Sequence, residues 1–153
     1  MKISTRGRYG LRAMVDLAIC YGKKPVLLKD ISESQDISMK YLDHIITSLR
    51  AAGLISRIKG GYILTRHPSL ITCLEVINSL EGSLAPVECV DNPNICNRMD
   101  TCVTIDVWKE IKDAQEKILS SLTLEDLGRR QKEKNKKYGI KTTNDRRIYY
   151  KNK

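Results

Sequence analysis

The apolar residues in the first third of the chain recur at the spacing of amphipathic helices. In residues 9–21 an apolar side chain returns every three to four positions, and Gly22 ends the run. Residues 29–35 allow a brief second helix, and residues 39–52 carry the clearest apolar stripe. Ser38 stands where a helix N-cap is preferred. Two short helices joined by a tight turn predict a helix-turn-helix.

A strand-like pattern replaces the helical spacing after Gly53. Residues 54–58 and 62–66 are rich in Ile, Leu, Thr and Tyr, and they flank the segment 59–61, whose two glycines tolerate positive φ. This pattern predicts a β-hairpin. A hairpin directly after a helix-turn-helix is a wing, so we expect a winged helix-turn-helix domain over residues 1–82.

The second half of the chain predicts two helices on either side of a long irregular segment. Thr72 and Glu75 form a T-x-x-E capping box that opens a helix ending near residue 81. Residues 83–103 show no periodicity and contain three of the five cysteines. In residues 104–122 apolar side chains recur at near-heptad spacing, and one helix alone cannot bury such a stripe efficiently. The pattern therefore predicts a homodimer.

These elements indicate a mainly α fold class with a small β-hairpin, consisting of a winged helix-turn-helix domain plus a long dimerisation helix. The expected divisions are the winged domain (1–82), a cysteine-bearing loop (83–103), the dimerisation helix with a short following helix (104–127) and a basic C-terminal tail (128–153). The pattern leaves open whether the tail contacts flanking DNA or docks on the dimer.

The charge is distributed unevenly around its net value of +9. Residues 1–70 carry 12 Lys and Arg against 5 Asp and Glu, residues 71–127 carry 4 against 11, and residues 128–153 carry 11 against 2. A basic front indicates a polyanionic partner. Phe is absent and Trp occurs once, so the chain lacks the stacking platforms of single-strand binders. We therefore expect double-stranded DNA as the partner.

The N-terminal segment has no apolar run long enough for a signal peptide or a membrane span. We therefore expect a soluble, cytoplasmic protein with no membrane contact. Disulfides are not expected, because the cytoplasm keeps thiols reduced. The sequence also has no Gly-rich phosphate loop, nucleophile elbow or His-rich metal motif, and this argues against an enzyme.

Three cysteines carry the chemistry of the irregular segment. Cys89, Cys96 and Cys102 are spaced C-x6-C-x5-C, and a loop can fold three thiolates around a common centre. Soft thiolates favour iron–sulfur clusters, zinc or copper(I), although the paired C-x2-C knuckles of zinc ribbons are absent. Three reactive thiols without a metal are the alternative. Cys20 and Cys73 lie in apolar helical patterns, so we expect them to be buried.

Taken together, these residues resemble the Rrf2 family of bacterial regulators. The resemblance covers residues 1–127 and is carried by the three-cysteine loop and by MKISTRGRY (1–9), ISMKYL (37–42), LRAAGLI (49–55), KGGY (59–62) and VINSLEG (76–82). It implies a winged helix-turn-helix, a long crossed dimerisation helix and, in many members, a 2Fe–2S or 4Fe–4S cluster ligated by the three loop cysteines. Such members sense nitric oxide, redox state, iron or cluster supply, and they repress or activate genes accordingly.

On this basis we expect a dimeric transcription regulator whose binding to operator DNA is gated by an iron–sulfur cluster on Cys89, Cys96 and Cys102. A cluster-free, thiol- or ligand-responsive regulator of the same fold is the alternative. The side chains expected to face bases are Lys40, Tyr41, Asp43 and His44; those expected to hold phosphates are Arg6, Arg8, Arg50, Arg57 and Lys59; and Ser38 is expected in the same surface.

The sequence departs from the family pattern in two places. The wing is short, because the few residues that many members place before Gly60 are missing, so minor-groove insertion is not expected. The second departure concerns the fourth cluster ligand: Ile105 and Arg8 occupy the positions where relatives carry a His or an acidic ligand, and neither is an ordinary ligand. The candidates left open are Glu88, Asp91, Asp100, Asp106, a histidine and a small exchangeable molecule.

Overall fold

Six α-helices and one β-hairpin form the part of the chain that the computed structural model describes, residues 2–140. In chain order they are α1 (Thr5–Ile19), α2 (Leu28–Gln35), α3 (Met39–Ala51), β1 (Ile55–Ile58), β2 (Gly61–Leu64), α4 (Cys73–Glu81), α5 (Thr104–Ser120) and α6 (Leu124–Lys137). Short 3-10 turns lie at Pro68–Leu70, Glu88–Val90, Pro93–Ile95 and Met99–Thr101. The predicted mainly α class with one hairpin is confirmed. Residues 141–153 of the predicted tail lie outside the described residues.

The helix-turn-helix forms where the sequence predicted it. α2 ends at Gln35, and its C-cap Asp36 adopts the left-handed backbone conformation with φ 53° and turns the chain. The hydroxyl of Ser38 then caps α3 by accepting a hydrogen bond from the backbone N–H of Tyr41 at 3.3 Å. The apolar stripe of α3 is buried as expected, and it consists of Leu42, Ile45, Ile46 and Leu49.

The wing is a hairpin of two four-residue strands. β1 runs antiparallel to β2, with Ile55 opposite Leu64. Val26 extends the sheet by one bridge, because it exchanges two backbone hydrogen bonds of 2.9 Å with Tyr62. Gly61 lies so close to this segment that a Cβ there would overlap the carbonyl oxygen of Val26, and its φ of 139° also favours glycine.

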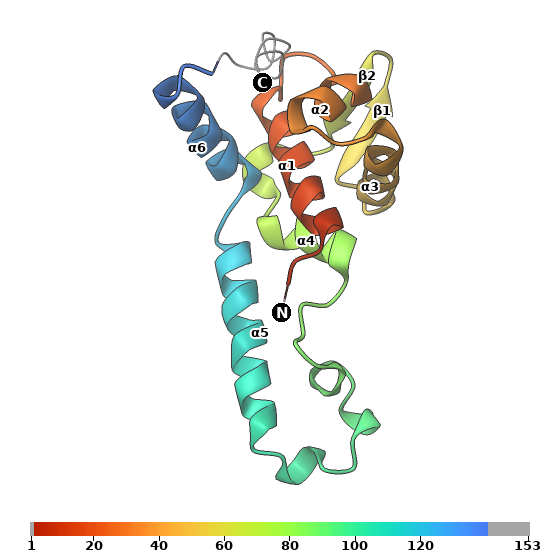
Figure 1. Cartoon of the computed structure of the whole chain (residues 1–153), viewed down its shortest axis with the longest axis vertical. Coiled ribbons are helices and arrows are strands. Elements are labelled where there is room, and N and C mark those ends of the chain that lie inside the picture. The colour runs from red at the N-terminus through yellow and green to blue at the C-terminus, as the bar shows by residue number, and fades with distance from the viewer. Residues whose placement is uncertain (1, 141–153) are drawn as a thin grey trace.

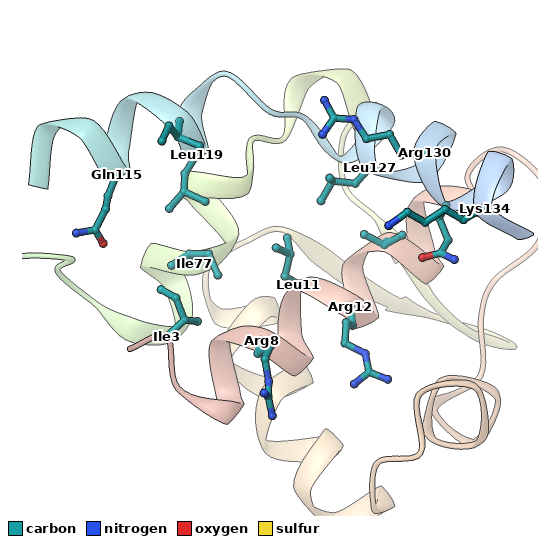
Figure 2. A pocket seen from close by; sticks show the side chains of 13 residues that line it. Ile3, Arg8, Leu11, Arg12, Ile77, Gln115, Leu119, Leu127, Arg130 and Lys134 are labelled. Carbon is teal, nitrogen blue, oxygen red and sulfur yellow. The ribbon is translucent and has the colours of Figure 1, made fainter. Parts of the chain in front are cut away.

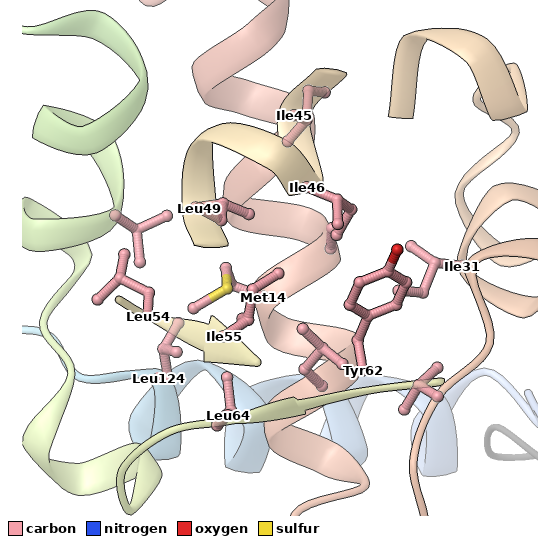
Figure 3. Close-up of a cluster of buried hydrophobic side chains, with 14 of the residues drawn as sticks. Met14, Ile31, Ile45, Ile46, Leu49, Leu54, Ile55, Tyr62, Leu64 and Leu124 are labelled. Atoms are coloured by element: carbon pink, nitrogen blue, oxygen red, sulfur yellow. The ribbon is translucent and has the colours of Figure 1, made fainter. Parts of the chain in front are cut away.

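The hydrophobic core fills the space between α1, α3, the wing and α6 (Figure 3). Met14 of α1 and Leu49 of α3 are fully buried in it, and Leu124 joins them from the first turn of α6. The two cysteines predicted to be buried, Cys20 and Cys73, are buried. The winged domain and α6 therefore share one core.

The last helix is longer than the sequence predicted. We expected a short helix after Thr123 and a tail from residue 128, whereas α6 continues to Lys137. Thr123 and Asp126 form a full capping box, and Gly128 is buried where α6 packs against α1. Three of the basic side chains that suggested a tail lie in the last turn, where the helix dipole favours positive charge: Lys134, Lys136 and Lys137.

The start of α6 is tied to the start of α4 by backbone pairing. Thr72 and Thr123 form an antiparallel bridge. The N–H of Cys73 donates to the carbonyl of Leu122 at 2.8 Å, and the N–H of Leu124 donates to the carbonyl of Ile71 at 2.9 Å. The segment between α5 and α6 is thus attached to the winged domain next to the start of α4.

α5 projects away from the winged domain (Figure 1). The cysteine loop leaves α4 beside the domain and joins α5 at its far end, so loop and helix together form an arm. Within residues 2–140 no helix is long and apolar enough to cross a membrane.

The packing of α6 predicts that truncating a buried leucine lowers the free energy of unfolding more than truncating an exposed one. Leu124→Ala should lower the free energy of unfolding by about 2–5 kcal/mol, because the side chain is 0% exposed. Leu70→Ala, at a residue that is 61% exposed, should change it by about 0.5 kcal/mol or less. Urea unfolding at a single protein concentration measures both. Equal responses would contradict a core role for α6.

Candidate DNA-binding face and cysteine loop

The side chains predicted to contact DNA lie at the surface of α1, α3 and the wing. All of them are exposed except Tyr41, which is half-buried. Ser38 uses its hydroxyl to cap α3, so this residue has a structural role at the start of that helix. Arg57 and Lys59 lie on β1 and in the hairpin turn, and β1 packs against α3.

An aromatic pair joins α1 to the exposed side of α3. The rings of Tyr9 and Tyr41 meet edge to face with centroids 6.2 Å apart. The guanidinium carbons of Arg8 and Arg12 lie 5.4 and 5.3 Å from the centroid of the Tyr9 ring, within the range of cation–π attraction. Tyr41, which we expected to face bases, therefore also packs against α1.

Two arginines of α1 hold the neighbouring helices. Arg6 donates from Nη2 to the hydroxyl of Ser48 on α3 at 2.6 Å. Arg12 donates to the side-chain oxygen of Gln35 at 2.7 Å and to its backbone carbonyl at 2.9 Å, at the end of α2. Sequence reasoning missed Arg12. The sequence feature that could have identified Arg12 is its spacing: it lies four residues after Arg8 and three after Tyr9, so the three side chains are neighbours on the surface of α1.

The three loop cysteines each lie at a 3-10 turn. Cys89 is inside the turn Glu88–Val90, Cys96 directly follows Pro93–Ile95, and Cys102 directly follows Met99–Thr101. All three are free thiols of intermediate exposure, and none of these turns has a buried residue. The loop thus presents three partly exposed thiols on turns that are not packed into the core.

The donor set fits an iron–sulfur cluster in its chemistry but is not gathered in space. Three thiolates from one loop are the soft ligands that such clusters take. Within the described residues, however, no group of three His, Cys, Asp or Glu side chains lies close enough to hold a metal ion. The loop would have to move to bring Cys89, Cys96 and Cys102 around one centre.

The environment of Cys102 favours its thiolate. The Thr104 hydroxyl lies 3.2 Å from Sγ, and its hydrogen bond is the main cause that lowers the pKa of this thiol. The backbone N–H groups of Ile105 and Thr104 at the start of α5 act in the same direction, and so does the charge of Arg98, while partial desolvation opposes them. The ionised form of Cys102 is therefore favoured by its neighbours at the start of α5.

One proposed fourth ligand is already engaged. Asp91 accepts a hydrogen bond from Lys112 on α5 at 2.8 Å, which lowers the pKa of the Asp91 carboxyl and raises that of Lys112. This ion pair attaches the middle of the loop to α5. Ile105 is buried, in keeping with its exclusion as a ligand, whereas the other three acidic candidates are exposed: Glu88, Asp100 and Asp106.

Known proteins match the chain over most of its length. The sequence matches the family Rrf2, described as an iron-dependent transcriptional regulator, over residues 3–130. It is similar to the HTH-type transcriptional regulator CymR of Bacillus subtilis (strain 168), with 41% identity over 130 residues that span 83% of this chain and 89% of the relative.

Two solved structures extend this similarity to the fold. CymR (YrzC), the global cysteine regulator of B. subtilis, gives a TM-score of 0.69 with 40% identity, and the match covers 84% of this chain and 96% of the other. IscR of T. potens gives a TM-score of 0.68 with 41% identity, and the match covers 83% and 85%. The predicted winged-helix architecture is thereby confirmed.

The hydrogen bond to Cys102 predicts a pH-dependent reactivity. Because iodoacetamide consumes the thiolate, Thr104→Val should raise the pKa of Cys102 and move its labelling midpoint to higher pH. Mass spectrometry of the Cys102 peptide across a pH series measures the midpoint. Thr101→Val is the matched control, because that hydroxyl donates to the carbonyl of Arg98. An unchanged midpoint in Thr104→Val would contradict the assignment.

Proposed function

The chain belongs to the Rrf2 family of transcriptional regulators, and from this premise we propose that it is a dimer whose operator binding is gated by an iron–sulfur cluster on Cys89, Cys96 and Cys102. Like its relatives, it is a transcription regulator rather than an enzyme. The observation that carries the proposal is the presence of three free, partly exposed thiols on one loop. That loop begins at the end of α4, a helix packed on α1 of the DNA-binding domain.

We assign the DNA contacts by charge and position. The N-terminal half of α3 presents Lys40, Asp43 and His44 on its exposed side, as a recognition helix in a major groove requires. The cations around this helix are placed to contact phosphates, and they are Arg6, Arg8, Arg50, Arg57 and Lys59. The surplus of basic residues in 1–70 supports this assignment.

The loop's own residues set the conditions for cluster binding. When bound, an iron–sulfur cluster supplies a redox-active centre that oxidants can alter or remove. The hydrogen bond between Thr104 and Cys102 favours the Cys102 thiolate, and the Asp91–Lys112 ion pair attaches the loop to α5. The fourth position is open to Glu88, Asp100, Asp106, a histidine or a small exchangeable molecule, whereas Asp91 is engaged by Lys112.

An apolar groove supports the dimer. It has a volume of about 700 Å³ and lies between α1, α4, α5 and α6 (Figure 2). Its apolar lining includes Leu11, Ile77, Ile118, Leu119 and Leu127, and its basic lining consists of Arg8, Arg12, Arg130 and Lys134. Ile118 is 62% exposed, so much of the α5 stripe is unburied in one chain. A second copy would cover this groove with the apolar stripe of its own α5.

A metal-free, thiol-responsive regulator is the second candidate. It is favoured by the lowered pKa of Cys102 and by the separation of the three thiols within the described residues. The similarity to a global cysteine regulator points in the same direction. In this case oxidation or modification of Cys102 would change the loop directly.

The cluster proposal predicts a visible absorption band that requires the loop cysteines. Anaerobically prepared protein should show thiolate-to-iron absorption with matching iron and sulfide content, and Cys96→Ala should lose most of it. Cys20→Ala, which alters a buried cysteine outside the loop, should keep it. Operator binding by Cys96→Ala should be the same before and after iron and sulfide loading. A flat visible spectrum after loading of the unaltered protein would favour the metal-free candidate.

The groove predicts that one charge can separate the dimer. Ile118→Glu should shift the protein from dimer to monomer in sedimentation velocity at micromolar concentration, because it places a carboxylate on the apolar lining. Ser120→Glu adds the same charge at an exposed position of α5 outside that lining, and it should remain dimeric. Retention of the dimer in Ile118→Glu would place the interface elsewhere.

A further inference from the structure

Glu81 lies at the junction between the cysteine loop and the DNA-binding domain. It is the last residue of α4, and Gly82 follows with a left-handed φ of 79° at the start of the loop. Its carboxylate reaches the start of α1. It accepts hydrogen bonds from the backbone N–H of Ser4 at 3.2 Å, from the backbone N–H of Gly7 at 2.9 Å and from the Ser4 hydroxyl.

The Glu81 carboxylate supplies the negative charge that the first turn of α1 lacks. The first turn of α1 contains no acidic residue, and Arg6 and Arg8 lie at this end. A negative charge is favourable at a helix N-terminus, where the dipole and unpaired N–H groups are positive. Ser4 provides the ordinary N-cap, since its hydroxyl accepts from the N–H of Gly7 at 3.2 Å. Glu81 binds both the cap residue and the helix, from a distant part of the sequence.

Two glycines make the contact between the helices direct. A Cβ at Gly7 would overlap Oε1 of Glu81, and a Cβ at Gly10 would overlap Cδ1 of Leu80 and lie 3.3 Å from Ile45 on α3. Side chains in such contact have little room to move independently. A displacement of the end of α4 therefore has to be accommodated by α1.

The same contacts continue toward the DNA-binding face. The first turns of α1 hold α3 through the hydrogen bond from Arg6 to Ser48 and the ring contact of Tyr9 with Tyr41. On the other side, Glu81 lines a cleft of about 180 Å³ together with Ile3 and residues 83–86 of the loop. Glu81 is thus the residue of α4 that adjoins the first residues of the loop.

From this arrangement we propose that Glu81 is a positioning residue that transmits the state of the cysteine loop to the DNA-binding face by holding the first turn of α1. The proposal rests on the sensing role proposed for the loop. When the loop changes its arrangement, the carboxylate shifts relative to Ser4 and Gly7, and the set of Arg6, Arg8 and α3 shifts with it. Coupling of this kind requires only that the two loop states differ in how well they hold Glu81 in place.

The test compares DNA affinity in two loop states. The probe is a fluorescein-labelled duplex enriched from a random library by the unaltered protein. Its Kd is measured for the reduced, metal-free protein and for protein loaded anaerobically with iron and sulfide. The unaltered protein should give a ratio of the two Kd values of about tenfold, within the usual range of allosteric coupling. Glu81→Gln should bring the ratio close to one.

Gly7→Ala provides a second perturbation that leaves Glu81 in the chain. Its methyl group displaces the carboxylate, while alanine favours the helix by about 1 kcal/mol, so the fold should be retained. Its Kd ratio should also fall toward one. Hydrogen exchange should be faster at the backbone amides of residues 5–8 in both variants. Glu133→Ala, which removes one negative charge from an exposed position on α6, should keep the full ratio.

The outcomes separate the two proposals. If Glu81→Gln and Gly7→Ala weaken binding equally in both states and preserve the ratio, Glu81 is only a structural cap and the coupling role is wrong. If the unaltered protein itself gives a ratio of one, the cluster-sensing proposal fails and the coupling role fails with it. A ratio lost in both variants and kept in Glu133→Ala supports the proposal.

Discussion

The close approach of α1 and α4 determines where the other elements of this protein lie. Gly7 and Gly10 leave no side chain between the two helices, so the end of α4 contacts the backbone of α1 directly. α3 packs on the same stretch of α1 through Ile45, and α6 covers another side of it at Gly128. α1 therefore contacts α3, α4 and α6, and a change in its position has to be accommodated by all three helices.

Basic and acidic side chains are distributed differently between the winged domain and the arm. The basic side chains of α1, α3 and the wing surround the exposed side of the domain, whereas acidic residues are concentrated in the arm formed by the loop and α5. Glu81 stands at the boundary, with its negative charge used at the positive end of α1. Within the arm, the Asp91–Lys112 pair ties the loop to α5.

The elements predicted correctly from the sequence are those that local sequence patterns determine. Ser38, the apolar stripe of α3 and the glycine-bearing turn were sufficient for the winged fold, because capping and periodicity act over a few residues. The length of α6 escaped prediction, since its lysines suggested a tail while its anchor, Leu124, is buried by distant residues. The bond from Arg12 to Gln35 and that from Glu81 to Ser4 depend on tertiary contacts. The cysteine spacing indicated a shared centre, but no periodicity fixes how such a loop folds.

The backbone pairing of Thr72 with Thr123 gives the arm two ends that are both fastened to the domain. An excursion of chain that leaves and re-enters a fold at fixed points behaves as an insertion, whose interior can vary while the host fold is conserved. Residue changes within the arm can therefore leave the fold of the winged domain in place. In evolutionary terms, the sequence of the arm and the sequence of the winged domain can diverge separately.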